Sequence, residues 1–296
     1  MNTKSLLIGL LIGIVIMFLC IVTAAIMYGL VRSKGTVLTG SAVGVIEMKG
    51  MIADSTDITK QLIEFRDNDR IKAVVFRIDS PGGVVGPSQE IYEEVRKFAA
   101  KKKLVVSMGS VAASGGYYIA APATMIYANP GTLTGSIGVL MKLSNVQGLL
   151  DKIGLYSFVL KSGKFKDSGS PVRPMTNEER QLFQGVIDSM HGQFVRAVAE
   201  GRKLPVETVR TLADGRVFSG EQALQVKLVD KIGNFQDAVD AAAKMAGIEG
   251  KPKLIYPEEK RPSLLSLLVE GTSARIVEKI KTESGLKAVY EMPGGN

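Results

Sequence analysis

The chain has 296 residues, which is enough for one large domain or two small ones with a substantial buried core. Its formal net charge is +8, but the basic residues are dispersed and form no patch interleaved with aromatic residues. The composition therefore does not indicate a nucleic-acid-binding surface. One cysteine, Cys20, and one histidine, His191, are too few for a disulfide or for a zinc site, and we expect neither a metal nor another cofactor.

An uncharged, apolar run dominates the N-terminus. It extends from Ser5 to Val31, and as a helix it would be about 40 Å long at 1.5 Å per residue, more than the hydrocarbon core of a bilayer requires. A cleaved signal peptide is the alternative, with small residues at Thr23–Ala25, but its apolar region would end there, whereas this run continues. The run therefore predicts an uncleaved membrane anchor within residues 1–34.

The charges that flank this run leave its orientation open. Lys4 and the amino terminus lie on one side, and Arg32 and Lys34 lie on the other, so positive charge favours neither side. The excess of basic residues suits an anionic membrane surface. Beyond the run, glycine, serine and threonine in residues 35–42 predict a short linker.

A domain predicted over residues 43–250 begins with alternating strands and helices. Its first apolar strands are predicted at residues 43–48, 71–78 and 104–106. Between the strands, apolar residues recur at helical spacing: Ile58, Leu62 and Phe65, and then Ile91, Val95 and Phe98. The order strand, helix, strand is typical of right-handed βαβ units and indicates an α/β domain with a parallel sheet.

The second half of the domain is predicted from caps, turns and apolar runs. Two capping boxes, Thr176 with Glu179 and Ser219 with Gln222, mark helix starts, and the first opens a long helix that ends near residue 201. Further strands are predicted at 125–128 and 156–160, an alanine-rich helix at 234–246, and a strand at 253–256 within a tail over 251–296. A glycine-rich segment at 132–138 lacks the lysine of a phosphate-binding loop.

Ser114 lies at a predicted corner between a strand and a helix. Alanine precedes it and two glycines follow, so a substrate carbonyl could approach both its hydroxyl and the backbone N–H of Gly115. The pattern Ala-x-Ser-x-Gly is a loosened form of the nucleophile elbow GxSxG. Serines at such corners are also frequent helix caps, so the motif alone does not identify a nucleophile.

A second loop, Asp79–Gly83, follows the strand predicted at 71–78. Ligands of α/β sheets tend to bind at the carboxyl ends of strands. Pro81 stiffens this loop, and its two glycines allow a close approach of another backbone. The loop is either an ordinary turn or the source of a second N–H donor that completes an oxyanion hole with Gly115.

A serine nucleophile requires a base, and the sequence offers two kinds. His191 would have to serve in a Ser-His-Asp triad, but a lone histidine on a helix is more often structural. A lysine can serve if burial keeps its amine neutral. Spacing does not choose among Lys161, Lys164 and Lys166.

Five motifs, in this order, resemble those of the signal peptide peptidase A family, peptidase family S49: Asp79–Gly83, Met108–Tyr118, Leu133–Gly138, Lys161–Asp167 and Ala213–Gly220. The resemblance covers residues 43–248 and implies a Clp-protease/crotonase-like α/β fold and a serine endopeptidase with a Ser-Lys dyad. It implies that Ser114 is the nucleophile, that Lys166 is the general base and that Ser136 orients the lysine. It also implies that Gly83 and Gly115 donate the N–H groups of the oxyanion hole.

Each motif occurs once, which resembles the short form of the family, in which neighbouring subunits share each site. The resemblance thus implies a homo-oligomer, an octameric ring, anchored in the cell membrane with its catalytic domain on the extracytoplasmic side. The implied substrates are signal peptides left in the membrane after their release from secreted precursors. Two alternatives stay open: a crotonase-like acyl-CoA enzyme, which would not need Ser114 or Lys166, and a membrane scaffold or peptide-binding ring with an inactive site.

Overall fold

The computed structural model describes residues 12–24, 27, 41–258 and 289–291. The chain divides into two units, Met1–Gly40 and Ser41–Asn296. In the first unit, residues 12–24 are helical, and the rest of the predicted span, apart from residue 27, lies outside the described residues. Within the described ranges, no helix has both the length and the apolar character needed to cross a membrane.

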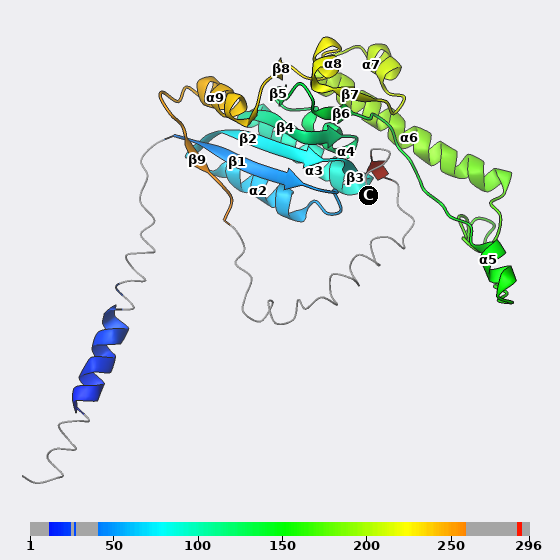
Figure 1. Cartoon of the computed structure of the whole chain (residues 1–296), viewed down its shortest axis with the longest axis horizontal. Coiled ribbons are helices and arrows are strands. Elements are labelled where there is room, and N and C mark those ends of the chain that lie inside the picture. The colour runs from blue at the N-terminus through cyan, green and yellow to red at the C-terminus, as the bar shows by residue number, and fades with distance from the viewer. Residues whose placement is uncertain (1–11, 25–26, 28–40, 259–288, 292–296) are drawn as a thin grey trace, which may run out of the picture. The chain divides into compact units, whose positions relative to one another are not determined.

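An eight-stranded sheet forms the centre of the second unit (Figure 1). The strand order is β7-β6-β4-β2-β1-β9, while β5 pairs with β4 and β8 pairs with β5. All of these pairs are parallel except β6 with β7. The predicted α/β fold with a largely parallel sheet is confirmed. Its strands are β1 Ala42–Lys49, β2 Ile71–Ser80, β4 Lys103–Ala113, β5 Met125–Ala128, β6 Leu133–Gly135, β7 Val217–Ser219, β8 Lys231–Ile232 and β9 Lys253–Ile255.

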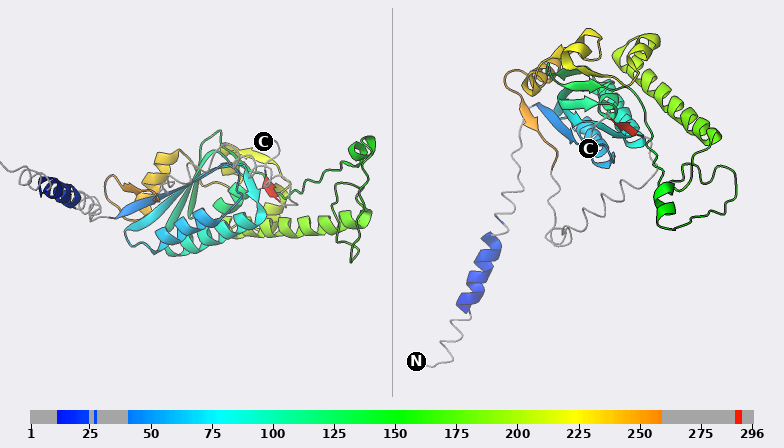
Figure 2. Two further views of the ribbon diagram at one scale, coloured as in Figure 1. Left: turned by 90° about the horizontal axis from the view of Figure 1, so that it is seen from below. Right: turned by 45° about the vertical axis from the view of Figure 1, so that its right-hand side comes forward.

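Helices cover both faces of this sheet, with α2 and α3 on one face and α9 on the other (Figure 2). Side chains of a strand alternate between the faces. On β2, Val74, Phe76 and Ile78 therefore enter the core cluster with α2 and α3, whereas Ala73 and Val75 pack with α9. The helices within the described residues of this unit are α2 Thr56–Asp67, α3 Val85–Lys101, α4 Gly115–Ala120, α5 Gln147–Lys152, α6 Asn177–Arg202, α7 Val206–Leu212, α8 Gly220–Gln225 and α9 Phe235–Met245.

Both predicted capping boxes are present. The Thr176 hydroxyl accepts the N–H of Glu179, and the Glu179 carboxylate accepts the N–H of Thr176. Ser219 and Gln222 make the same reciprocal pair at the start of α8. Each box satisfies donors that a helix start leaves unpaired, which explains why both helices begin where the sequence predicts.

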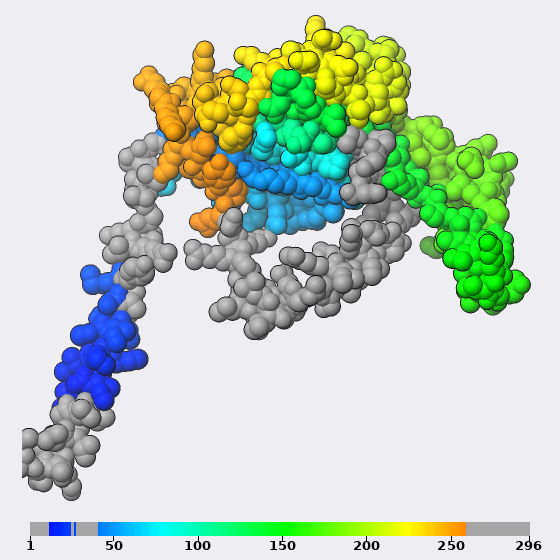
Figure 3. All heavy atoms as spheres, in the orientation of Figure 1, coloured from blue at the N-terminus to red at the C-terminus, as the bar shows by residue number. Residues whose placement is uncertain are grey.

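Helix α6, the longest among the described residues, is anchored mainly through its C-terminal part. Its buried apolar side chains all lie between Phe194 and Ala199. We call residues 141–190 the arm: they comprise α5, the loop after it and the N-terminal half of α6. The arm extends beyond the sheet in both views of Figure 2 and is green in Figure 3.

The predicted strand at 156–160, which lies in the arm, is wrong. These residues form no regular element, and Tyr156, Phe158 and Leu160 are 81%, 87% and 94% exposed. A strand requires a neighbour that completes its backbone hydrogen bonds. The described part of this chain supplies no such neighbour, so the apolar pattern remains without a partner surface.

Two strands lie within the predicted tail. β9 extends the sheet beside β1, at Ala42–Gly44. The other, β10 (Val289–Glu291), pairs antiparallel with β3 (Gly82–Val84), and Tyr290 lies opposite Gly83 in this register. The C-terminal strand thus lies beside the loop from which the sequence predicts an oxyanion donor.

Candidate active site

Ser114 occupies the corner between β4 and α4, as the sequence predicts. Its backbone angles are φ 52° and ψ −117°, a conformation that is unfavourable for any residue with a side chain. Two backbone hydrogen bonds hold the corner: the Ser114 N–H donates to the Gly135 carbonyl, and the Tyr118 N–H donates to the Ser114 carbonyl, both at 2.8 Å. A strained serine between a strand and a helix is the geometry of a nucleophile elbow.

The Ser114 hydroxyl is buried and has no hydrogen-bond partner among the described residues. Most buried polar groups are paired, and an unpaired one costs about 1–3 kcal/mol. Backbone strain and an unpaired hydroxyl occur here at the same residue. This combination indicates a chemical role in which a substrate or a base completes the hydroxyl's hydrogen bonding.

Gly83 and Gly115 lie against each other near this serine. A Cβ atom on Gly115 would lie 2.8 Å from Ser88 Oγ and 3.2 Å from the backbone nitrogen of Gly83. A Cβ atom on Gly83 would lie 2.2 Å from the carbonyl oxygen of Ile52. Both positions therefore require glycine, and the Gly83 nitrogen lies within contact distance of Gly115. This arrangement is compatible with two N–H donors that share one carbonyl oxygen.

Backbone pairing determines which way Gly83 faces. The Ile52 N–H donates to Gly82, and the Ile52 carbonyl accepts from Val84, at 2.9 and 2.8 Å. Polar groups of successive strand residues point to opposite edges, so the N–H and carbonyl of Gly83 point away from Ile52. They face the edge on which β10 pairs.

Ser136 lies at the same end of the sheet as Ser114. It follows Gly135, the residue that accepts the Ser114 N–H, and it is itself buried with φ 50°. Its N–H donates to the Arg216 carbonyl at 2.8 Å, which ties it to the turn before β7. Ser136 also lines a cavity of about 330 Å³ with Val139, Leu140, Ile187 and His191 among its walls.

His191 makes a structural hydrogen bond. Its Nε2 lies 2.8 Å from the carbonyl oxygen of Ala213. A carbonyl only accepts, so Nε2 carries the hydrogen and is not free to take a proton from a serine. This contact favours the structural interpretation of the histidine over the triad.

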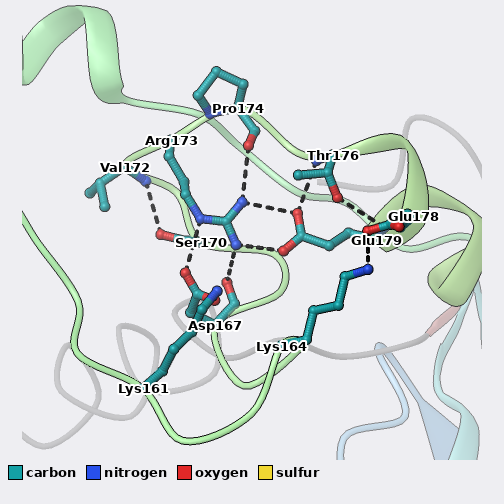
Figure 4. A network of polar contacts seen from close by, with 10 residues as sticks. All are labelled: Lys161, Lys164, Asp167, Ser170, Val172, Arg173, Pro174, Thr176, Glu178 and Glu179. Atoms are coloured by element: carbon teal, nitrogen blue, oxygen red, sulfur yellow. Dashed lines mark hydrogen bonds and ion pairs between the residues drawn. The ribbon is translucent and has the colours of Figure 1, made fainter.

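Lys166 lies in the arm, and its side chain is exposed. Its loop is attached to the first turn of α6, where Lys164 pairs with Glu178 at 2.6 Å (Figure 4). Between Glu179 and His191, which shares a cavity with Ser136, α6 rises about 18 Å at 1.5 Å per residue. One chain therefore brings together Ser114, Ser136, Gly83 and Gly115, but it does not bring Lys166 to them.

Arg173 organises the loop that carries Lys166, a role that the sequence alone did not reveal. Its guanidinium pairs with the carboxylates of Asp167 and Glu179 (Figure 4). Hydrogen bonds from Arg173, and for Asp167 also from Lys161, lower the pKa values of both carboxyl groups to about 2. An arginine six residues after an aspartate is too common a pattern to have marked this cluster.

We expect acid to release this loop before it unfolds the sheet. Both carboxyl groups have a lower pKa in the folded chain than the usual values of about 4, so their contribution is complete above pH about 4 and is lost as the pH falls through about 2. Hydrogen exchange, corrected for its intrinsic pH dependence, should show faster exchange in residues 161–180 at pH 2.5 than at pH 5. Exchange that accelerates equally in β2 and β4 would contradict a local release.

Among the described residues, no three His, Cys, Asp or Glu side chains are grouped so that they could hold a metal ion. The chain matches Peptidase family S49 over residues 96–249 and Clp protease over residues 44–132. It is 43% identical over 237 residues to a candidate protease of Synechocystis sp., which covers 79% of this chain and 85% of that protein.

Two further relatives carry more specific names. A candidate signal peptide peptidase, SppA, of Enterococcus faecium is 40% identical over 188 residues, or 62% of this chain and 54% of that protein. The chloroplastic serine protease SPPA of Arabidopsis thaliana is 35% identical over 238 residues, or 78% of this chain and 35% of that protein. The chain thus spans about half of the Enterococcus faecium protein and about a third of the Arabidopsis thaliana protein.

Proposed function

Because the chain belongs to peptidase family S49 and is a serine protease, we propose that it is a membrane-anchored endopeptidase in which Ser114 and Lys166 form a Ser-Lys dyad. The observation that carries the proposal is the buried hydroxyl of Ser114, which lies on a strained corner and has no hydrogen-bond partner in the described part of the chain. A peptide carbonyl beside Gly83 and Gly115 would lie next to this hydroxyl. The match to the peptidase family favours this function over an acyl-CoA enzyme.

The reaction follows from these groups. Ser114 Oγ attacks the scissile carbonyl carbon while its proton passes to the neutral amine of Lys166, which Ser136 orients. The N–H groups of Gly83 and Gly115 stabilise the oxyanion of the tetrahedral intermediate. The lysine then returns the proton to the leaving amine, the C–N bond breaks, and an acyl-enzyme remains for water to hydrolyse in a second, equivalent step.

The arm supports an oligomer in which one subunit supplies Lys166 to the Ser114 of its neighbour. Soluble monomers rarely expose large contiguous apolar patches, whereas the arm exposes eleven large apolar side chains. A head-to-tail contact of this kind closes into a ring when the rotation between neighbours divides a full turn, and we propose a ring of eight subunits. The exposed residues are Val146, Leu149, Ile153, Leu155, Tyr156, Phe158, Val159, Leu160, Phe165, Leu182 and Val186.

We propose that its substrates are signal peptides that remain in the membrane after their release from secreted precursors. The uncharged run Ser5–Val31 supports an anchor that would hold the enzyme at the bilayer, with the catalytic domain on the extracytoplasmic side. The name of the Enterococcus faecium relative supports the same substrate class. Val139, Leu140 and Ile187 give the cavity beside Ser136 apolar walls that suit an apolar side chain.

Hydrolysis by the full-length protein in detergent tests this function. An apolar fluorogenic peptide with the sequence of a signal-peptide core should be cleaved internally, a charged peptide of equal length should be cleaved far more slowly, and an acyl-CoA thioester should stay intact. Ser114→Ala should abolish the peptide cleavage. An assembled wild-type ring that binds the apolar peptide without cleaving it would instead identify a scaffold, and turnover of the thioester would identify the acyl-CoA enzyme.

Gly115→Ala is expected to reduce kcat by about 10²- to 10³-fold, the range found when an oxyanion donor is lost. Its methyl group would fill the space beside the Gly83 nitrogen that the carbonyl oxygen of the substrate would need. The nearest contact, Ser88 Oγ at 2.8 Å, belongs to a side chain, so the double variant Gly115→Ala/Ser88→Ala relieves the crowding. A double variant with normal thermal stability and wild-type kcat would contradict the oxyanion role.

A further inference from the structure

We propose that Arg173 is the positioning residue for Lys166: it fixes Asp167, the residue that follows the lysine, and so sets where the amine can reach. This inference rests on the proposed Ser-Lys dyad. Arg173 itself touches neither the substrate nor Ser114. Its effect on the reaction would pass through the loop that it holds (Figure 4).

The guanidinium of Arg173 uses all of its nitrogen atoms as donors. Nε donates to Asp167 Oδ2 at 2.9 Å, and Nη2 donates to the backbone carbonyl of Asp167 at 3.1 Å. Nη1 and Nη2 donate to the two carboxylate oxygens of Glu179, and Nη1 also donates to the carbonyl of Pro174. Lysine could not reproduce this set, because only arginine presents a planar fork of donors.

This cluster is more buried than the Lys164–Glu178 ion pair of the same loop. The side chains of Glu179, Asp167 and Arg173 are 4%, 12% and 29% exposed, whereas Lys164 and Glu178 are both more than half exposed. Exposed pairs contribute little to structure, while shielded bidentate pairs fix geometry. Glu179 is also part of the capping box of α6, so the loop is attached to the hydrogen-bonded first turn of that helix.

The attachment reaches Lys166 through the backbone. Residue 167 is held at both its carbonyl and its carboxylate, and it directly follows the lysine. The Lys166 N–H donates to Gly163, and the Ser168 N–H donates to Phe165, so the lysine lies within consecutive turns whose C-terminal end is fixed. A fixed backbone restricts the amine to the positions that its own side-chain rotations allow.

The cluster also keeps the nearest carboxylate in sequence away from the lysine. A carboxylate paired with the amine would favour the protonated form, which cannot act as a base. Asp167 is instead engaged by Arg173 and by Lys161. Removal of Arg173 would therefore loosen the loop and leave the Asp167 carboxylate to Lys161 and the Glu179 carboxylate to the Thr176 N–H.

Variants in the full-length, assembled protein test the inference. Arg173→Met is expected to lower kcat for the apolar peptide by about 10- to 100-fold with little change in KM, because a displacement of about 1 Å in a catalytic group can cost this much. Arg173→Lys retains the charge without the fork and should recover only part of the rate. Lys164→Met is the matched control: it removes a cation from the same loop but breaks only an exposed pair, and its kcat should equal that of the wild type.

Mixed assemblies separate positioning from a loss of folding. If Arg173→Met damages only the arm, co-assembly with Ser114→Ala should restore activity. In such a ring, a Ser114→Ala subunit supplies an intact arm with Lys166 to the intact Ser114 of a neighbouring Arg173→Met subunit. An Arg173→Met protein that assembles normally and keeps the wild-type kcat would overturn the inference. It would also be overturned if the mixture of Arg173→Met with Ser114→Ala stayed inactive while the mixture of Lys166→Met with Ser114→Ala regained activity. A Ser114→Ala protein that remains active would instead overturn the proposed dyad itself.

Discussion

Ser114→Ala is expected to lower kcat for an apolar peptide by about 10⁴- to 10⁶-fold, the range found when a catalytic serine is removed. The variant loses the oxygen atom that would form the acyl-enzyme, whereas Gly83 and Gly115, the proposed oxyanion donors, remain. Single-turnover and steady-state hydrolysis by the assembled protein measure the effect. Peptide binding by the inactive variant should be unchanged, since a methyl group fits where the hydroxyl was.

The thermal stability of Ser114→Ala shows whether a loss of activity comes from unfolding. The Ser114 hydroxyl is buried without a partner among the described residues, so its removal should leave the thermal midpoint unchanged or raise it. Ser110→Ala is the matched substitution, because Ser110 lies on the same strand with an exposed side chain. It should be fully active. A Ser114→Ala protein that is inactive only because its midpoint has fallen would not support the nucleophile.

Lys166→Met is expected to be the other variant with an effect of several orders of magnitude, because no neutral amine would then take the proton from Ser114. A mixture of Lys166→Met with Ser114→Ala subunits tests whether neighbouring subunits share the site. In rings assembled from equal amounts of Lys166→Met and Ser114→Ala subunits, a site is complete when the first type supplies the serine and the second the lysine. About a quarter of the wild-type rate should return, if each subunit takes either place at random in a head-to-tail ring.

The control for this experiment is His191→Ala. The hydrogen bond of His191 to the Ala213 carbonyl predicts a modest loss of stability with the proton transfer intact. An inactive His191→Ala protein together with an active Lys166→Met protein would replace the dyad by a histidine base. If Lys166→Met and Ser114→Ala are each inactive and their mixture also stays inactive, then either Ser114 and Lys166 of one site belong to the same subunit or the two residues do not act together.

Local sequence signals predicted most of the fold because those signals are satisfied inside one chain. Apolar strands between amphipathic helices placed β1, β2 and β4, and two capping boxes placed the starts of α6 and α8. The strand predicted at 156–160 failed for the opposite reason: its apolar residues find no partner in the described chain. Periodicity identifies a residue that needs a neighbour, but it does not say which molecule supplies that neighbour.

Within the candidate site, too, some residues could be predicted from local sequence and others could not. The small residues around Ser114 follow from a close backbone approach, so the corner could be predicted. Lys166 could be singled out only by resemblance, since lysines are frequent and its loop lies far along the arm. The contacts of Arg173 depend on how that loop folds back on the first turn of α6, and no spacing rule describes such a fold.

The pairing of β10 with β3 makes peptide binding at this edge a competition within the molecule. An extended peptide that adds to this edge of β3 must first displace residues 289–291. Because the competing strand belongs to the same chain, its effective concentration does not fall when the protein is diluted. The apparent dissociation constant of such a peptide is therefore its intrinsic value divided by the fraction of chains whose β3 edge is open. We therefore expect peptides that make few backbone contacts with β3 to bind weakly, because residues 289–291 occupy this edge.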